Sequence, residues 1–145
     1  HLTTRRQRQM CIRDRSQTDK EFVLTRAGRL HEIHHTILGL PITVAGEAAA
    51  TAFYASTGSN PSQIGILSSW MLRGAYEPSE RRLIWDAIGF GIAVGQVVPE
   101  LFSPRWEEGW DRPITDWQDE LGISEVLKTS PFQDEFATVY GFNLQ

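Results

Sequence analysis

A pair of histidines one helical turn apart, followed by one isolated carboxylate, most constrains how this chain folds. His31 and His35 are four positions apart, so a helix places both imidazoles on one face with Cβ atoms roughly 6 Å apart. Glu32 lies about 100° further round the same helix. Glu47 is the only charged residue between His35 and Arg73, and an unpaired buried carboxylate is costly. The sequence therefore predicts that the chain folds back and brings Glu47 alongside the histidines.

These side chains form a candidate metal site. Two imidazoles and one or two carboxylates suit zinc, with other divalent ions as weaker alternatives. We expect His31, His35 and Glu47 to bind the ion, with Glu32 as a further ligand or as a base. The pentapeptide alone also fits ordinary residues on the flank of an amphipathic helix. His34 points away from the pair, so we expect it to lie at the surface or to support the ligands from behind.

The first fifteen residues are predicted not to belong to the native protein. Residues 5–15 are what a transposase-type sequencing adapter encodes when it is translated. We therefore expect residues 1–15 to be translated adapter, and the native sequence to begin, already truncated, near Ser16. The alternative is a natural basic arm that binds nucleic acid or anionic lipid.

Charge and cysteine content narrow the partners of residues 16–145. The excluded residues carry a net charge of +4, so the −4 of the whole chain becomes −8 for the rest. An acidic domain repels phosphate backbones, so no nucleic acid is expected as a partner. The single cysteine, Cys11, falls in the excluded part, which leaves neither a disulfide nor a thiolate ligand. About 130 residues suffice for one core, so we expect one domain or most of one.

Helical periodicity predominates, and no segment alternates as a half-buried strand would. Helices are predicted over residues 19–38, 43–56, 62–73 and 80–98, with shorter ones near 104–110 and 114–121. A capping box of Thr18 and Glu21 begins the first helix, and Gly39 followed by Pro41 ends it. The last twenty residues are expected to form an ordered tail with little regular structure. The predicted class is all-α, a compact domain of about five to six helices, truncated at its N-terminus.

Three further packing features are predicted for the C-terminal half. Residues 87–98 carry no charge but are too few to span a bilayer, so this helix is expected to be buried or to lie against lipid. The spacing of its glycines is wrong for a dinucleotide-binding loop and favours close helix packing at Gly89, Gly91 and Gly95. Three tryptophans at helical spacing are expected to anchor the core: Trp106, Trp110 and Trp117.

The motif belongs to a wider pattern that covers about a hundred residues. Eleven residues separate His35 from Glu47, and His-Thr-x-Leu-Gly-x-Pro-x-x-x-x-Gly-Glu runs between them. Further along the chain, the segments Arg-Trp-Glu at 105–107 and Glu-Leu-Gly-Ile at 120–123 lie at the distances from this motif that the wider pattern requires. Residues 24–123 thus resemble the C-terminal half of the coenzyme Q biosynthesis protein 4 family, helical proteins of ubiquinone synthesis. The family motif has aspartate where this chain has Glu32, and we expect that the family's N-terminal half was lost by truncation.

The resemblance implies a peripheral membrane protein that acts on a polyprenylated aromatic lipid. The family is credited with removing the C1 carboxylate of the ubiquinone precursor ring and with helping to assemble the biosynthetic enzymes. On this basis His31, Glu32 and His35 are the expected catalytic residues, and zinc is the expected cofactor. The expected partners are the lipid, other ubiquinone-biosynthesis proteins, the membrane surface and a second copy of the chain. The expected location is the cytoplasmic face of the membrane in a bacterium, or the mitochondrial inner membrane in a eukaryote.

Two alternatives stay open from the sequence. In a zinc-dependent hydrolase of the His-Glu-x-x-His type, His31 and His35 bind zinc and Glu32 is the general base. The short interval to Glu47 and the lack of a strand to align a peptide weigh against it. In a non-catalytic, lipid-binding scaffold, the metal would only fix the first two helices.

Overall fold

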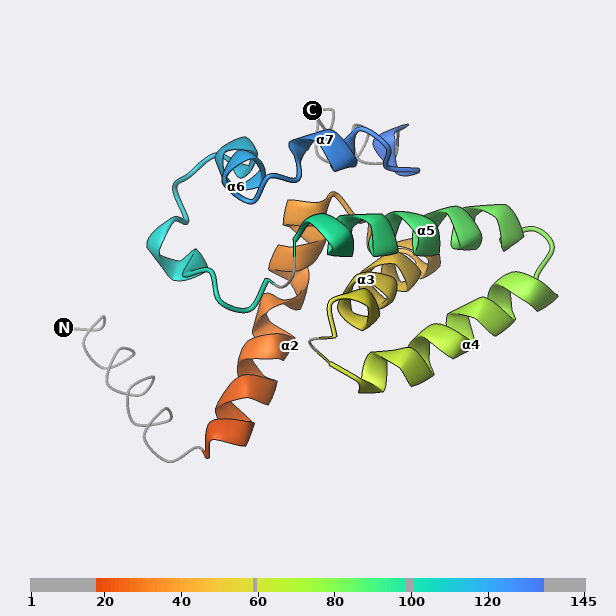
Figure 1. The fold of residues 1–145 in the computed structure, drawn as a ribbon, viewed down its shortest axis with the longest axis horizontal. Coiled ribbons are helices and arrows are strands. Elements are labelled where there is room, and N and C mark those ends of the chain that lie inside the picture. Colours follow the sequence, from red (N-terminus) through yellow and green to blue (C-terminus); the bar gives the residue numbers. More distant parts are fainter. Residues whose placement is uncertain (1–17, 59, 99–100, 135–145) are drawn as a thin grey trace. The chain divides into compact units, whose positions relative to one another are not determined.

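The structure is a computed structural model that describes residues 18–58, 60–98 and 101–134. The chain divides into two compact units, residues 1–31 and 32–145, and the boundary falls inside a helix that is continuous across it. The helices are α2 (Asp19–Leu38), α3 (Val44–Ser56), α4 (Ser62–Tyr76), α5 (Arg81–Val97), the 3-10 helix η1 (Trp106–Glu108), α6 (Ile114–Glu120) and α7 (Ser124–Leu127) (Figure 1). The described ranges contain no strand, so the all-α prediction is confirmed.

Both ends of α2 are fixed by the predicted local interactions. The Thr18 backbone N–H donates to the Glu21 carboxylate (2.9 Å), and the Glu21 N–H donates to the Thr18 hydroxyl (3.3 Å). At the other end Gly39 takes a positive φ of 62°, and the Leu40 N–H donates back to the His35 carbonyl (2.8 Å). This is the Schellman geometry that glycine favours, and it turns the chain sharply out of α2.

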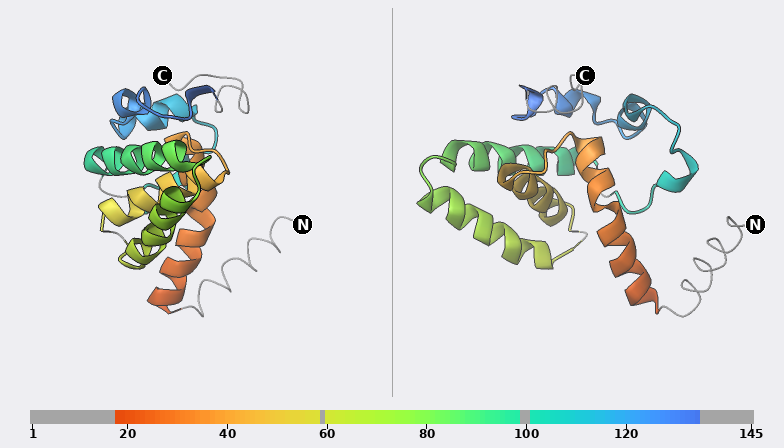
Figure 2. Two further views of the ribbon diagram at one scale, coloured as in Figure 1. Left: turned by 90° about the vertical axis from the view of Figure 1, so that its right-hand side faces the viewer. Right: turned by 180° about the vertical axis from the view of Figure 1, so that it is seen from behind.

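Helices α3, α4 and α5 pack against one another and form the core of the second unit (Figure 2). Small side chains on α3 allow the close approach: Ala48 and Ala52 are fully buried against Ile84 and Ile88 of α5. None of the helices in the described part of the chain is both long enough and apolar enough to cross a membrane.

The glycines of α5 have different surroundings. A Cβ at position 91 would collide with the Ala49 backbone carbonyl, and a Cβ at position 95 would collide with the Ser56 hydroxyl. Close packing is therefore confirmed at these two positions. Nothing lies within 4 Å of a Cβ at position 89, so the same prediction is wrong for Gly89, which faces away from α3.

The segment after α5 differs from the prediction in two ways. Of the three tryptophans, Trp106 is buried as expected, whereas Trp110 is 69% exposed and is not a core anchor. The short helix α7 was not predicted; it ends two residues into the segment 126–145 that was expected to form an irregular tail, and Ile123 and Leu127 at its ends are fully buried. Residues 135–145 of that tail lie outside the described residues, as do residues 1–15, so the adapter assignment stays a prediction.

Candidate metal centre and neighbouring pocket

His31, His35 and Glu47 form a cluster that could hold a metal ion. Each residue offers one ligand atom, and these atoms lie within 4.8 Å of one another. The two histidines are one turn apart on the continuous helix α2, and Glu47 lies in the first turn of α3. His35 is 2% exposed, whereas His31 and Glu47 are half-buried. The predicted return of the chain thus brings Glu47 to the histidine pair.

The turn between α2 and α3 holds Glu47 in place. The Thr43 hydroxyl caps α3 by accepting from the Gly46 N–H (3.2 Å), and the Glu47 N–H donates to the Thr43 carbonyl (2.9 Å). A Cβ at position 46 would collide with the Pro41 carbonyl, so only glycine fits there. The amino end of α3 also carries a partial positive charge that favours a carboxylate in its first turn.

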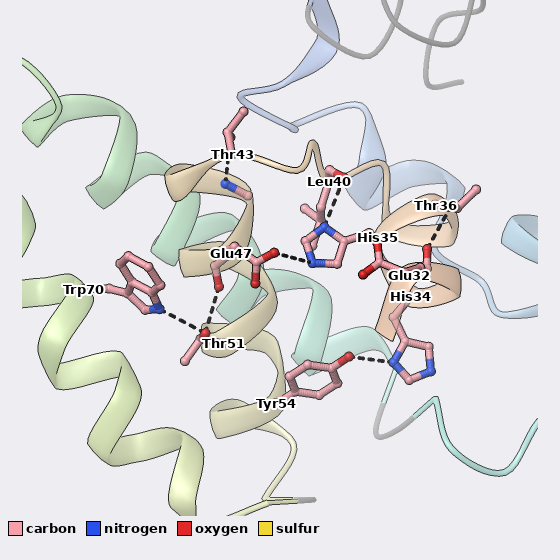
Figure 3. A network of polar contacts seen from close by, with 11 residues as sticks. Glu32, His34, His35, Thr36, Leu40, Thr43, Glu47, Thr51, Tyr54 and Trp70 are labelled. Carbon is pink, nitrogen blue, oxygen red and sulfur yellow. Dashed lines mark hydrogen bonds and ion pairs between the residues drawn. The ribbon is translucent and has the colours of Figure 1, made fainter. Parts of the chain in front are cut away.

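The surroundings of the His35 ring suit a metal ligand (Figure 3). Its Nδ1 donates to the Leu40 carbonyl (3.3 Å), since a carbonyl only accepts. In the neutral ring the lone pair is then on Nε2, which lies 3.4 Å from the Glu47 carboxylate. A histidine that donates from one nitrogen to a backbone carbonyl presents the other to a metal. A divalent cation between Nε2 and the carboxylate therefore fits these donors.

His34 is buried and has a hydrogen-bond partner at each ring nitrogen, so the expectation that it lies at the surface is wrong, and the alternative that it supports the ligands from behind stays a prediction. It is 1% exposed, with Nε2 at 3.0 Å from the Leu101 carbonyl and Nδ1 at 2.7 Å from the Tyr54 hydroxyl. Because the carbonyl only accepts, Nε2 donates to it and the Tyr54 hydroxyl donates to Nδ1. Burial, followed by the charges of Glu47 and Glu32, raises the pKa of Tyr54 well above its ordinary value. Tyr54 therefore stays a protonated donor.

Glu32 is exposed and is not one of the three clustered residues. Its backbone carbonyl accepts a hydrogen bond from the Thr36 hydroxyl (2.9 Å), which lies four residues later and therefore one turn along the helix (Figure 3). Glu32 is one of the residues that line a pocket of about 280 Å³ between α2 and residues 106–117. Whether Glu32 acts as a ligand or as a base stays a prediction.

The pocket was not expected from the sequence. Trp106 and Trp117 contact each other in it, with ring centroids 4.7 Å apart, and the Arg112 guanidinium lies 4.0 Å over the Trp117 ring. The tryptophan spacing was a usable signal, but it indicated a core cluster rather than a cavity wall.

These features define a helical protein with a candidate His-His-Glu metal centre at a helix–turn–helix. Its sequence matches the family model described as "Coenzyme Q (ubiquinone) biosynthesis protein Coq4" over residues 4–126. The chain belongs to the Coq4 family, as the resemblance indicated.

Similar proteins fall in the same family. The mitochondrial ubiquinone biosynthesis protein COQ4 of Arthroderma otae is 33% identical over 104 residues, covering 70% of this chain and 38% of that protein. The Sclerotinia sclerotiorum protein of the same description is 31% identical over 108 residues, covering 73% and 37%. This chain thus spans less than two fifths of the length of these relatives.

A solved structure supports the fold. A Nostoc punctiforme protein assigned to ubiquinone biosynthesis superposes with a TM-score of 0.67 at 24% identity, covering 74% of this chain and 53% of that one.

Proposed function

We propose that the protein acts in ubiquinone biosynthesis, at a metal centre where a polyprenylated benzoate precursor loses its C1 carboxylate. The observation that carries this proposal is the cluster of His31, His35 and Glu47, with ligand atoms within 4.8 Å of one another. Membership of the Coq4 family supports a role in ubiquinone biosynthesis. Decarboxylation, like the substrate, is an expectation from the family resemblance.

His31, His35 and Glu47 would hold zinc, or another divalent ion, and Glu32 would serve as a fourth ligand or as a base. When bound, the metal supplies Lewis acidity toward an oxygen of the substrate. The contact from Nδ1 to Leu40 holds the His35 ring in position, and the first turn of α3 holds the Glu47 carboxylate. In the reaction, the bond between the ring and the carboxylate breaks and CO₂ leaves. The electron pair stays on the ring carbon, which then takes up a proton.

We also propose that the protein lies at a membrane surface, where it meets its lipid substrate and other ubiquinone-biosynthesis proteins. Helix α4 supports this, because large apolar side chains are exposed along it: Ile64, Ile66, Met71, Leu72 and Tyr76. Exposed apolar patches mark interaction surfaces. A second copy of the chain is a further proposed partner. The mitochondrial relatives favour the inner mitochondrial membrane if the organism is a eukaryote.

Metal content and turnover together test the proposal. We expect close to one zinc ion per purified chain, and its loss in a His35→Ala, Glu47→Ala double variant. A Glu125→Gln variant is the control, because that carboxylate is exposed on α7 and pairs with Lys128. Release of CO₂ from a prenylated hydroxybenzoate should follow metal content.

Three results would contradict the proposal. A chain that is folded but contains no metal would show that these residues do not form a metal centre. A metal-loaded chain that releases no CO₂ would favour the scaffold alternative. Hydrolysis of peptides that depends on Glu32 would favour the hydrolase.

A further inference from the structure

A second pocket of about 390 Å³, the charged pocket, is lined by residues between Pro104 and Leu121. Its lining includes both members of two ion pairs: Arg105 with Glu108 (3.0 Å), and Arg112 with Glu120 (2.6 Å). Two positive and two negative side chains therefore surround one small cavity. None of them belongs to the cluster of the candidate metal centre, so this pocket is a separate candidate site.

The charged side chains keep hydrogen-bonding capacity for a ligand. A guanidinium group has five N–H donors. In the part of the chain that the structure describes, Arg105 hydrogen-bonds to protein only through Nη1, and Arg112 only through Nη2. The partner glutamates, Glu108 and Glu120, likewise use one oxygen each. Exposed ion pairs of this kind contribute little to stability, so they can rearrange around a ligand at small cost.

A ligand that carries both charges suits this pocket better than a simple anion or a simple cation. A phosphate group accepts two parallel hydrogen bonds from a guanidinium group. A simple phosphate would also meet repulsion from the two carboxylates, and a simple cation would meet repulsion from the two arginines. A phosphate linked to an ammonium group satisfies both kinds of side chain, because the ammonium N–H groups donate to the carboxylates.

The neighbouring pocket beside α2 gives the same ligand a place for an apolar chain. The two pockets share Gly109, Arg112 and Trp117, so they adjoin. At their border the Arg112 guanidinium lies 4.0 Å over the Trp117 ring. Most other residues that line the pocket beside α2 are apolar: Ile33, Ile37, Trp106, Trp110 and Ile114. A charged pocket beside an apolar one matches a molecule with a charged head and an apolar chain.

We infer that the two pockets bind one zwitterionic phospholipid. Its phosphate lies against the two arginines, its ammonium group lies against the two glutamates, and one acyl chain enters the pocket beside α2. This ligand goes beyond the proposed function, since the proposed benzoate precursor has neither a phosphate nor an ammonium group. Binding therefore does not depend on the metal centre, and lipid affinity should not follow zinc content.

Short-chain lipids test the inference, because below their micelle concentration they dissolve as single molecules and present no membrane surface. Indole N–H signals in nitrogen-15 NMR spectra of the 145-residue chain report the site. We expect dihexanoylphosphatidylethanolamine to shift the signals of Trp110 and Trp117, which line the pocket beside α2. The signal of Trp85, which is on α5, should not shift.

Two related compounds separate the parts of the ligand. Dihexanoylphosphatidylglycerol keeps the phosphate and both chains but lacks the ammonium group, so it should bind about tenfold more weakly. Free phosphorylethanolamine keeps both charges but buries no chain, so it should also bind at least about tenfold more weakly. The second comparison distinguishes a phospholipid from a soluble phosphate that carries the same head group.

Variants make the assignment specific. A Glu108→Gln, Glu120→Gln double variant should lose the preference for phosphatidylethanolamine over phosphatidylglycerol. The matched control is Glu77→Gln with Glu125→Gln, which removes the same net charge at two exposed positions outside the pocket and should keep the preference.

A single substitution tests the phosphate contact. Arg105→Gln should weaken binding of both phospholipids several-fold without unfolding the chain, because this side chain is 79% exposed. Arg82→Gln is its control, since that side chain is exposed on α5 and pairs with Asp86.

The opposite results would overturn the inference. Equal binding of the two phospholipids to the parent chain would exclude recognition of a zwitterion. Phosphorylethanolamine that binds as tightly as the lipid would assign the charged pocket to a soluble ligand. Unshifted Trp110 and Trp117 signals at saturating lipid would exclude the pocket beside α2 as the site of the chain.

Discussion

Replacing Gly46 by alanine should destabilise the fold and weaken the metal centre together. The added Cβ would overlap the Pro41 carbonyl oxygen and would lie 2.9 Å from its carbon and 3.2 Å from Cδ of the same residue. These are backbone and ring atoms that cannot rotate away, so Pro41 and the first turn of α3 must separate. Overpacking of this kind costs about 1–3 kcal/mol. The displaced turn carries Glu47, so its distance from His35 should change as well.

Thermal unfolding and metal analysis measure both effects. A loss of about 2 kcal/mol corresponds to a fall in Tm of about 4–8 °C for a chain of this size. The matched control is Gly65→Ala in α4, where nothing lies within 4 Å of the new Cβ. That substitution should be neutral or stabilising by about 0.4–1 kcal/mol, because alanine restricts the unfolded chain. A Gly46→Ala protein with unchanged Tm and full zinc content would refute the reasoning.

Three other substitutions have expected outcomes. Tyr54→Phe should cost about 1–3 kcal/mol in urea unfolding, because it removes the hydroxyl that donates to buried His34. Thr43→Ala should cost about 1 kcal/mol in the same assay, because it removes the cap of α3. The hydrogen bond from Arg73 lowers the pKa of Glu80, so the pair stabilises the fold above the ordinary glutamate pKa and loses this effect as the pH falls through the lowered value. Glu80→Gln should therefore reduce the pH dependence of Tm on the acid side, and an unchanged acid limb would contradict this.

Much of the candidate centre was predictable because local interactions determine it. A capping box, a glycine with positive φ and a four-residue histidine spacing act within one or two helical turns. They fixed the ends of α2 and placed both imidazoles on one face. The turn between α2 and α3 is short and an unpaired buried carboxylate is costly, so the sequence favoured a position of Glu47 beside the histidines.

Some predictions failed because the surroundings of a residue depend on distant segments. His34 was expected to lie at the surface or to support the ligands from behind; the structure buries it, and its partners Tyr54 and Leu101 are 20 and 67 residues away. Gly89 and Gly91 are both glycines of α5, but only a Cβ at position 91 would collide with the backbone of α3. Periodicity alone cannot show which face of α5 meets a neighbour.

The sequence by itself therefore determined the all-α class, the bounds of the long helices to within three residues and the grouping of His31, His35 and Glu47, since short-range backbone and side-chain interactions encode them. Only the tertiary structure decided that His34 is buried, that Trp110 is exposed beside a pocket and that Glu32 lies at the pocket's edge. Those properties arise when residues 101–117 pack against α2, a long-range contact that no local sequence pattern specifies.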